Sequence, residues 1–424
     1  MNTRFDVLVV GAGPAGIAAA VSAAEVVRRV ALVDDNPSPG GQIWRKGAAL
    51  PASARRWLGA LNASSVSCLS GWSVYDAPAP GVLSAERNSE HINLHYDKLI
   101  LATGARELFL PFPGWTLPNV FGAGGLDAMA RGGLPVQGKR IVIAGSGPLL
   151  LAVAAHLSAR GARIVAVCEQ APIPRLARFA VHLLPQPAKL MQGVAYRWAF
   201  REAAFHTRCW PVAANGTEKL ESVTLQQVTR QWSISCDYLA CGFHLVPNIE
   251  LAQLIGCRIE DGLVATDDLQ TTSLADVLCA GEPTGIGGVE LALVEGQVAG
   301  LAAVGNLEVA QKLARRRRKM LGFARSLSQA YALDPQLRKL ASDATFVCRC
   351  EDVAFGALRP HNSWRDAKLH TRCGMGPCQG RVCGAAASFL FNWNIDGIRP
   401  PVIPALVSSL AATNTISDDT KENT

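Results

Sequence analysis

The sequence predicts an α/β protein with two dinucleotide-binding folds of the Rossmann type, the second inserted in the first, and a small cysteine-rich domain after them. Three observations support this prediction. A glycine-rich loop follows a β-branched run near the N-terminus, a second loop of the same kind begins at Gly145, and a strand–loop–helix pattern over Asp276–Gly300 returns to the first fold. Because this pattern comes after the second loop, the first fold is discontinuous.

The composition is that of a globular protein with more than one domain. The 424 residues are 49% hydrophobic, 18% charged and 6% aromatic, which excludes a disordered chain. The net charge is +7, but no aromatic residues alternate with the basic ones, so we expect no nucleic-acid partner. The densest basic run, Arg315–Lys319, is interpreted as a solvated helix face, with a partner or membrane-surface contact as the alternative.

No apolar run free of loop residues reaches the length of about 20 residues that a membrane-spanning helix needs, and the first residues lack the pattern of a signal peptide. We therefore expect a cytoplasmic protein, with at most peripheral contact with the inner membrane. In that compartment thiols stay reduced, and clustered cysteines bind metal more often than they pair.

The first glycine loop lies in a complete βαβ unit. The strand Phe5–Val10 leads directly into G-A-G-P-A-G, and a second strand ends at Asp34, whose carboxylate can accept hydrogen bonds from ribose hydroxyls. Gly11 provides the tight turn, Gly13 lets the backbone approach a pyrophosphate, and Gly16 allows close helix–strand packing. The predicted cofactor-binding residues of this unit are Gly11, Gly13, Pro14, Ala15, Gly16 and Asp34.

The first loop does not by itself distinguish FAD from NAD. Three later segments belong to the same predicted domain: Asn36–Arg45, the strand and Thr-Gly turn of Lys98–Arg106, and Asp276–Gly300. The predicted organisation is 1–106 and 247–320 for the first domain, 107–246 for the inserted domain, 321–340 for a linker helix, 341–400 for the cysteine-rich domain and 411–424 for a disordered tail.

The second loop departs from the nucleotide-binding pattern. It reads Gly145-Ser-Gly147-Pro-Leu-Leu150, so that a leucine stands where the third glycine allows close packing, while Glu169 occupies the acid position. A duplicated fold can keep its shape and lose its ligand. NAD or ATP could bind here, but we do not expect a second nucleotide to be essential.

Five of the chain's 12 cysteines lie between Cys348 and Cys383, with the spacings C-x-C and then C-x4-C twice. Structural zinc sites usually have CxxC pairs, and a redox disulfide beside a flavin needs one, but the chain has no CxxC. A [2Fe–2S] cluster needs four thiolates and backbone amides, which glycine-rich loops supply. The spacing favours a cluster over zinc and leaves open whether the second pair is Cys373/Cys378 or Cys378/Cys383.

Several motifs together resemble one family. They are GxGxxG with GGQIW, ATGARE, CAGEPTGIGGVELALVEGQ, CRCE and TRCGMGPCQGRVCG. This set resembles the FAD- and [2Fe–2S]-containing subunit of heteromeric bacterial amine dehydrogenases. That group includes D-hydroxyproline dehydrogenase, the A components of octopine and nopaline oxidases, the B component of hydrogen cyanide synthase and dye-linked L-proline dehydrogenase alpha. The resemblance covers residues 4–390, and the last domain is similar to bacterioferritin-associated ferredoxin, although that type usually ends in CxxC.

The resemblance implies roles for individual residues. It makes Cys348, Cys350, Cys378 and Cys383 the cluster ligands and leaves Cys373 as the spare thiol. It also adds residues to the FAD site, where glutamate in place of the usual aspartate is a departure of one methylene. These additional residues are Gly41, Gln42, Thr103, Gly104, Gly281 and Glu282.

The resemblance also implies a function. The chain is expected to be an electron-transfer subunit of a dehydrogenase for a small amino or imino acid, with D-hydroxyproline or proline as the leading substrates. The amine is expected to be oxidised on an amino-acid-oxidase-like flavoprotein partner, and a small ferredoxin-like subunit is a further candidate partner. No catalytic residue is predicted, because none of the eight histidines belongs to a motif. The alternatives are a stand-alone NAD(P)H-dependent reductase that feeds a ferredoxin-like acceptor and a non-enzymatic assembly subunit.

Overall fold

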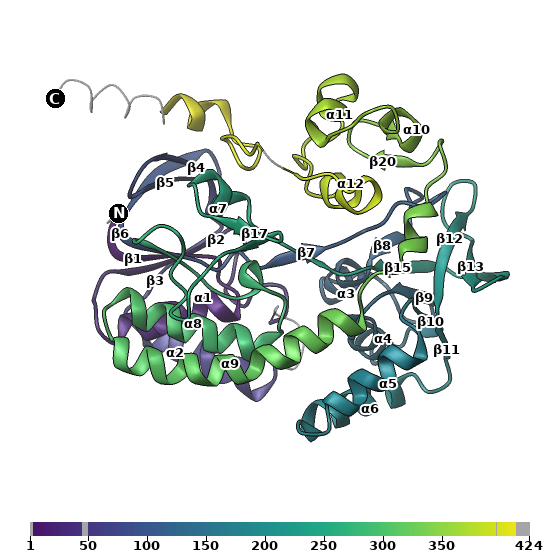
Figure 1. Cartoon of the computed structure of the whole chain (residues 1–424), viewed down its shortest axis with the longest axis horizontal. Coiled ribbons are helices and arrows are strands. Elements are labelled where there is room, and N and C mark those ends of the chain that lie inside the picture. The colour runs from purple at the N-terminus through teal and green to yellow at the C-terminus, as the bar shows by residue number, and fades with distance from the viewer. Residues whose placement is uncertain (1–2, 45–49, 396, 413–424) are drawn as a thin grey trace. The chain divides into compact units, whose positions relative to one another are not determined.

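The computed structural model describes residues 3–44, 50–395 and 397–412 and confirms the α/β class with two Rossmann-type sheets (Figure 1). Contacts divide the chain into two compact units, which we name unit 1 and unit 2. Unit 1 contains Met1–Arg106, Pro247–Ala324 and Ile398–Thr424, and unit 2 contains Glu107–Val246 and Arg325–Gly397. Most of the tail predicted to be disordered, residues 413–424, lies outside the described residues.

The sheet of unit 1 has the strand order β3-β2-β1-β6-β5-β4, and β19 also pairs with β6. The pairings among β3, β2, β1, β6 and β19 are parallel, whereas β5 is antiparallel to both β6 and β4. The strands are β1 (Arg4–Val10), β2 (Val30–Asp34), β3 (Ser67–Ser70), β4 (Ser73–Ala79), β5 (Val82–Arg87), β6 (Glu90–Leu101) and β19 (Val277–Cys279). Since β19 comes from the returning part of the chain, the first fold is discontinuous, as predicted.

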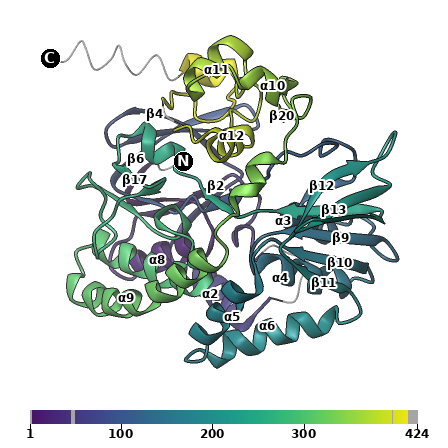
Figure 2. The ribbon, with the colours of Figure 1, turned by 45° about the vertical axis from the view of Figure 1, so that its right-hand side comes forward.

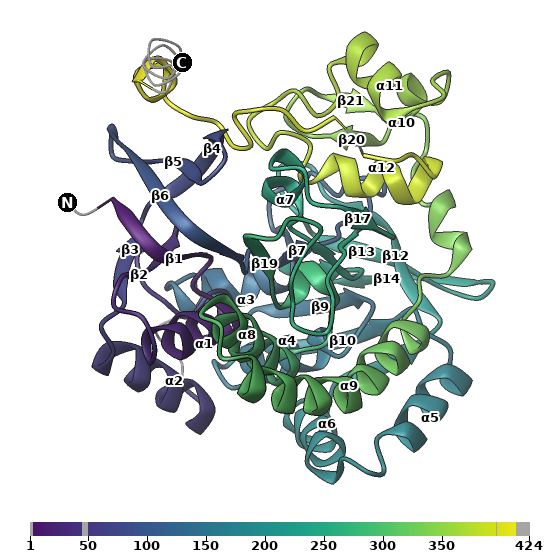
Figure 3. The same ribbon diagram turned by 60° about the vertical axis from the view of Figure 1, so that its left-hand side comes forward.

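Helices α1 (Pro14–Ala24) and α8 (Val289–Ala303) lie side by side in unit 1 (Figure 3). Their backbones touch at two glycines. A Cβ atom on Gly296 would lie 2.1 Å from the carbonyl oxygen of Ala15, and one on Gly300 would lie 2.3 Å from that of Ala19. The other elements are α2 (Ala52–Ala63), α7 (Glu250–Leu254), β17 (Ile259–Glu260), β18 (Leu263–Val264) and η1 (Glu282–Thr284).

Unit 2 has a parallel sheet of five strands in the order β11-β10-β9-β15-β8 and an antiparallel sheet of three strands, β12-β13-β14. The parallel strands are β8 (Val120–Gly122), β9 (Arg140–Gly145), β10 (Arg163–Glu169), β11 (Ala204–Thr207) and β15 (Tyr238–Gly242). The antiparallel strands are β12 (Cys209–Asn215), β13 (Ser222–Gln227) and β14 (Arg230–Ser235). The helices are α3 (Ala123–Arg131), α4 (Leu149–Ser158), α5 (Ile173–His182) and α6 (Pro187–Ala199). Two short strands connect the units, β7 (Ala105–Glu107) and β16 (Leu245–Pro247).

The cysteine-bearing segment also packs within unit 2. Leu337 and Leu340 enter the hydrophobic core that contains Trp210, and the indole Nε1 of Trp115 donates to the carbonyl oxygen of Phe346 at 2.7 Å. The segment contains η2 (Pro335–Lys339), β20 (Phe346–Cys348), β21 (Val353–Ala354), α10 (Phe355–Leu358), α11 (Trp364–Thr371) and α12 (Cys383–Phe391). The domain limits predicted from the sequence remain predictions.

The predicted linker helix and basic run both need correction. The helix expected over 321–340 is the end of a longer helix, α9 (Leu307–Ala330), which is followed by the separate turn η2. Strong helix formers begin at residue 307, and Asp334-Pro335 prevents continuation. Within the basic run Arg317 is buried rather than solvated, and its Nε lies 2.8 Å from Oε1 of Glu295, while the other four cations are exposed.

Among the described residues, no helix is both long and apolar enough to cross a membrane.

The contact between α1 and α8 generates a stability prediction. In Gly300→Ala the new methyl group meets a backbone oxygen that cannot rotate away, so we expect a loss of roughly 1–3 kcal/mol of unfolding free energy. Gly59→Ala in α2 is the control, because a Cβ atom there meets nothing within 4 Å, and it should stabilise by about 0.5–1 kcal/mol. Chemical denaturation of both variants checks this. Equal stabilities would show that α8 can move away from α1 at little cost.

Candidate cofactor sites

The first glycine loop has the geometry that a dinucleotide pyrophosphate needs. A Cβ atom on Gly11 would lie 2.2 Å from the carbonyl oxygen of Ala102, and one on Gly16 would lie 1.8 Å from that of Gly11, so both positions require glycine. Around Gly13, by contrast, a Cβ atom would meet nothing within 4 Å. The amides of Ala15 and Gly16 form no hydrogen bond with the described residues. The loop therefore offers free donors at a helix N-terminus beside open space.

Asp34 lies at the end of β2, where the sequence places the ribose acceptor. Its carboxylate accepts from the backbone amide of Ala12 and, at 2.8 Å, from that of Asn36. The chain then turns back toward the loop, because the amide of Gly40 donates to the carbonyl oxygen of Ala12 at 2.8 Å. Gly41 has φ +57°, and a Cβ atom there would lie 2.9 Å from Cα of Gly13. The described part of the predicted GGQIWR segment thus lies against the phosphate loop.

Gln42 is exposed, two residues before the buried Trp44. Arg45, the last residue of the segment, lies outside the described residues.

The remaining predicted residues meet where β6 and β19 end. Thr103 donates from Oγ1 to the carbonyl oxygen of Asn248 at 2.6 Å, and Gly104 has φ +68°. Oε2 of Glu282 would lie 4.0 Å from a Cβ atom on Gly104, and its carboxylate accepts from the amide of Ala105. Burial raises the pKa of Glu282. The structure therefore brings the Thr-Gly turn and the Gly-Glu turn together.

Two residues behind the Gly-Glu turn were not identified from the sequence. Oε2 of Glu295 accepts from the amide of Gly281 at 3.0 Å, and its Oε1 pairs with Arg317. Burial raises the pKa of Glu295, while the guanidinium beside it opposes this shift. Thr284 donates from Oγ1 to the carbonyl oxygen of Gly281 at 2.9 Å. The turn is therefore held from behind, and its cofactor-facing side stays available.

The second glycine loop offers a phosphate less. The amide of Leu150 donates to the carbonyl oxygen of Gly147 at 3.1 Å, and that of Leu151 donates to the carbonyl oxygen of Pro148 at 3.2 Å, so the first turn of α4 uses its own donors. Glu169 accepts from the amides of Gly147 and Ala171, both at 2.8 Å, and burial raises its pKa to about 7. A loop that satisfies its own amides has few left for a ligand.

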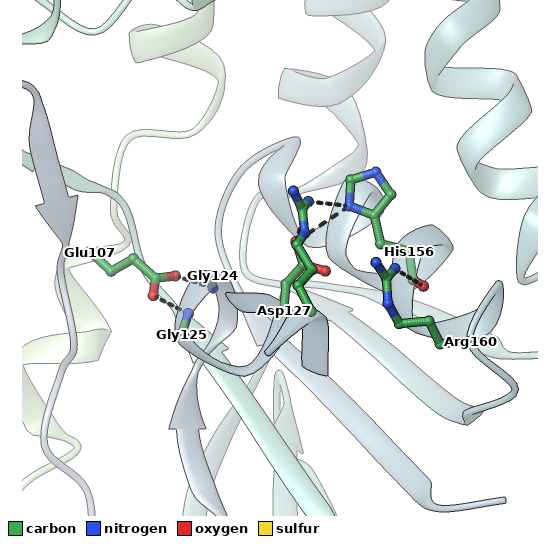
Figure 4. A network of polar contacts seen from close by, with 7 residues as sticks. Glu107, Gly124, Gly125, Asp127, His156 and Arg160 are labelled. Atoms are coloured by element: carbon green, nitrogen blue, oxygen red, sulfur yellow. Dashed lines mark hydrogen bonds and ion pairs between the residues drawn. The ribbon is translucent and has the colours of Figure 1, made fainter. Parts of the chain in front are cut away.

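Two further buried acids of unit 2 lie at α3 and were not identified from the sequence (Figure 4). Glu107 accepts from the amides of Gly124 and Gly125 at 2.7 and 3.1 Å, and burial raises its pKa. Asp127 pairs with Arg131 at 2.6 Å and lies 3.4 Å from Nδ1 of His156. Glu107 thus caps α3, and Asp127 ties α3 to α4.

The structure brings all five cysteines of the last segment together. The sulfur atoms of Cys348, Cys373 and Cys383 all lie within 4.8 Å of one another. Cys378 forms sulfur–sulfur hydrogen bonds with both Cys383 and Cys350. Cys373, the predicted spare thiol, therefore lies inside the group, and the choice of four ligands stays a prediction.

The glycines of TRCGMGPCQG explain how this loop reaches the thiols. Gly374 and Gly380 have φ +81° and +79°, and Cβ atoms there would lie 2.5 and 3.1 Å from Cζ2 of the buried Trp364. A Cβ atom on Gly376 would lie 2.4 Å from Cβ of Cys350. The loop can therefore pass between an indole and a cysteine only because it lacks side chains at these positions.

The surroundings of the sulfurs favour thiolate at two positions. Hydrogen bonds from Cys373 and Cys383 lower the pKa of Cys348, which also accepts from the amides of Gly374 and Glu351. A hydrogen bond from Cys383 lowers the pKa of Cys378, which also accepts from backbone amides. Soft sulfur ligands and directed amides are what an iron–sulfur cluster requires, so the donor set fits one.

A second group that could hold a metal ion is His361, Asp366 and His370, whose ligand atoms lie within 4.8 Å of one another. Here both imidazole Nδ1 atoms face the carboxylate, at 2.9 and 3.1 Å. These contacts account for the grouping as a hydrogen-bonded surface cluster.

Gly13→Val tests the first loop. The side chain meets no protein atom but fills the open space beside the free amides, so FAD retention should fall at least tenfold while the apoprotein keeps its melting temperature. Gly59→Ala serves again as control and should keep its flavin. Flavin absorbance per chain after gel filtration is the measurement, and full retention by Gly13→Val would place the cofactor elsewhere.

Serine substitutions test the ligand set. Cys373→Ser should keep the [2Fe–2S] absorbance and electron paramagnetic resonance signal, and Cys383→Ser should lose them, because the resemblance makes only Cys383 a ligand. The reverse result would show that the upstream pair, Cys373/Cys378, binds the cluster and that the implied ligand set is wrong at this position.

Comparisons with known proteins agree with this geometry. Residues 5–299 match the family model described as pyridine nucleotide-disulphide oxidoreductase. The A component of opine oxidase from Agrobacterium tumefaciens is 30% identical, with 97% of this chain and 92% of that protein covered. Hydrogen cyanide synthase subunit HcnB of Pseudomonas aeruginosa is 29% identical, with 90% and 91% covered.

Among solved structures, L-proline dehydrogenase from P. horikoshii aligns with a TM-score of 0.68 at 18% identity, covering 96% of this chain and 79% of that one. This likeness shows the shared fold. Because the family model spans more than half of the sequence and the opine oxidase relative aligns over nearly its whole length, the chain belongs to the pyridine nucleotide-disulphide oxidoreductase family, among the relatives of the opine oxidase A component.

Proposed function

We propose that the chain is the FAD- and [2Fe–2S]-containing electron-transfer subunit of a heteromeric dehydrogenase that oxidises a small amino or imino acid. The observation that carries this proposal is the presence, in one chain, of an open dinucleotide loop and a group of five cysteines. A bound flavin takes up two electrons together and releases them one at a time, and an iron–sulfur cluster accepts them singly. The combination therefore suits a relay between a two-electron donor and a one-electron acceptor.

The chain's own residues supply binding and orientation. Gly11, Gly13 and Gly16 would shape the pyrophosphate site, Asp34 would accept from the ribose, and the Gly281-Glu282 turn would face the rest of FAD. Cys348, Cys350, Cys378 and Cys383 would hold the two irons, and backbone amides directed at the sulfurs would tune the potential.

The relatives' names support the partner and substrate class. The opine oxidase relative and HcnB are both named as subunits, and the fold neighbour is named as an L-proline dehydrogenase. D-hydroxyproline and proline are therefore the leading substrates, with the amine oxidised on an amino-acid-oxidase-like flavoprotein partner. A small ferredoxin-like subunit is a further partner of this proposal. The proposed location is cytoplasmic, at most in peripheral contact with the inner membrane.

The second candidate is a stand-alone NAD(P)H-dependent reductase, which the second Rossmann-type sheet of unit 2 favours. It requires that sheet to bind a nicotinamide nucleotide. The first turn of α4 uses its own amides, and Leu149 rather than a small residue stands exposed at its start. These two features favour the relay.

Cofactor analysis and rapid mixing test the proposal. The purified chain should hold flavin, iron and acid-labile sulfide in fixed ratio, and NADH alone should bleach the flavin far more slowly than D-hydroxyproline does in the full complex. The readouts are absorbance at the flavin and cluster bands.

Three results would contradict the relay. A chain with neither flavin nor sulfide would exclude it outright. Rapid bleaching by NADH without a partner would identify the stand-alone reductase. Flavin and cluster spectra that stay unchanged when substrate is added to the full complex would identify a non-enzymatic assembly role.

A further inference from the structure

The helical hairpin α5–α6 of unit 2 turns an apolar face to solvent. It follows β10, and α6 lies against α4 at the edge of the unit (Figure 2). None of the residues Pro187–Ala199 is buried. Six large apolar side chains of the hairpin and its connection are 63–71% exposed: Ile173, Val181, Leu184, Met191, Val194 and Trp198.

The polarity of α6 is the reverse of that of an ordinary surface helix. Met191, Val194 and Trp198 follow one another at i, i+3 and i+7, which places them on one exposed face. The inward side carries the polar groups instead. Arg197 donates from Nη1 to the carbonyl oxygen of Phe200 at 3.2 Å, and the ring of Tyr196 lies 6.2 Å from that of His156 in α4. A surface helix normally buries its apolar stripe, so something else must cover this one.

The charge of the segment limits what can cover it. Residues 172–201 contain five cationic side chains and no carboxylate. The cations are Arg175, Arg178, Lys189, Arg197 and Arg201. A second copy of the same face would repel it, whereas a partner with an apolar centre and acidic surroundings would complement it. Trp, Met and Arg are also the residues enriched at protein interfaces.

A membrane surface fits the same face less well. Helices that lie on membranes keep lysine and arginine free on the polar side to reach lipid headgroups. In α6 that side packs against the protein, and Arg197 is occupied by the carbonyl oxygens of Phe200 and Ala203.

We infer that the exposed face of α5–α6 is the docking surface for the substrate-oxidising flavoprotein subunit, whose matching face is apolar with acidic residues around it. This inference rests on the proposed function, because it assigns a place on the chain to the partner that the function requires. The relatives named as subunits match this chain over nine-tenths of its length or more, so the hairpin lies within the shared region.

The test uses the native complex, purified from source cells through a tag on this chain. The double variant Met191→Glu/Trp198→Glu places two carboxylates on the apolar face. Val407→Glu is the matched control, because Val407 is 82% exposed and lies far from the hairpin in the sequence. The readouts are the number of co-purifying flavoprotein subunits per chain, by quantitative mass spectrometry, and deuterium uptake of peptides within 173–199 in the free chain and in the complex.

We expect at least a tenfold loss of the co-purifying flavoprotein from the double variant, which should keep its own flavin and cluster absorbance, and no loss from the control. In the wild type, the 173–199 peptides should exchange more slowly in the complex. This second measurement needs no variant and decides the matter if the double variant misfolds.

Unchanged exchange of these peptides in the complex would overturn the inference. So would a double variant that keeps its partner but no longer sediments with phosphatidylglycerol vesicles, which would assign the face to a membrane. In either case a complex whose flavin is still reduced by substrate leaves the proposed function standing. Absence of flavin and sulfide would instead refute the function itself.

Discussion

The backbone contact between α1 and α8 closes a fold that the chain builds from two separate stretches. Gly296 and Gly300 let α8 lie directly on Ala15 and Ala19, in the same helix that begins at the phosphate loop. From α8, Glu295 reaches the amide of Gly281 and is neutralised by Arg317 in α9. The first glycine loop and the Gly-Glu turn are therefore positioned by one small-residue interface, which explains how a large insertion leaves the cofactor site intact.

The cysteine group depends on a comparable absence of side chains. Gly374 and Gly380 pass over Trp364, and Gly376 passes beside Cys350, so the loop can bring its thiols to those of the CRCE segment. The same closeness places Cys373 among the others. A fifth thiol within the group follows from a loop that is tightly wound around an indole, whichever four sulfurs bind the irons.

The two Rossmann-type folds have diverged in opposite directions. The first keeps free amides beside Gly13, whereas the second uses its amides internally and holds Glu169 among them. A duplicated fold without a demanding ligand can change its surface at little cost. Its α5–α6 hairpin carries the most concentrated exposed apolar side chains of the described residues, at positions where the first fold has no matching helix pair. The second fold thus supports assembly in our proposal, and the first supports redox chemistry.

Features set by short stretches of chain could be predicted from the sequence. The strand–loop–helix order and the glycine spacing depend on neighbours a few residues apart, and they identified both folds, Asp34 and the grouping of the cysteines. Other features join positions far apart along the chain. Glu295 and Arg317, the contacts of Gly296 and Gly300, and the place of Cys373 follow only from packing. Helical period predicts a stripe on α6 but not its direction, because which face meets the protein is decided by the neighbouring helix and not by the helix itself.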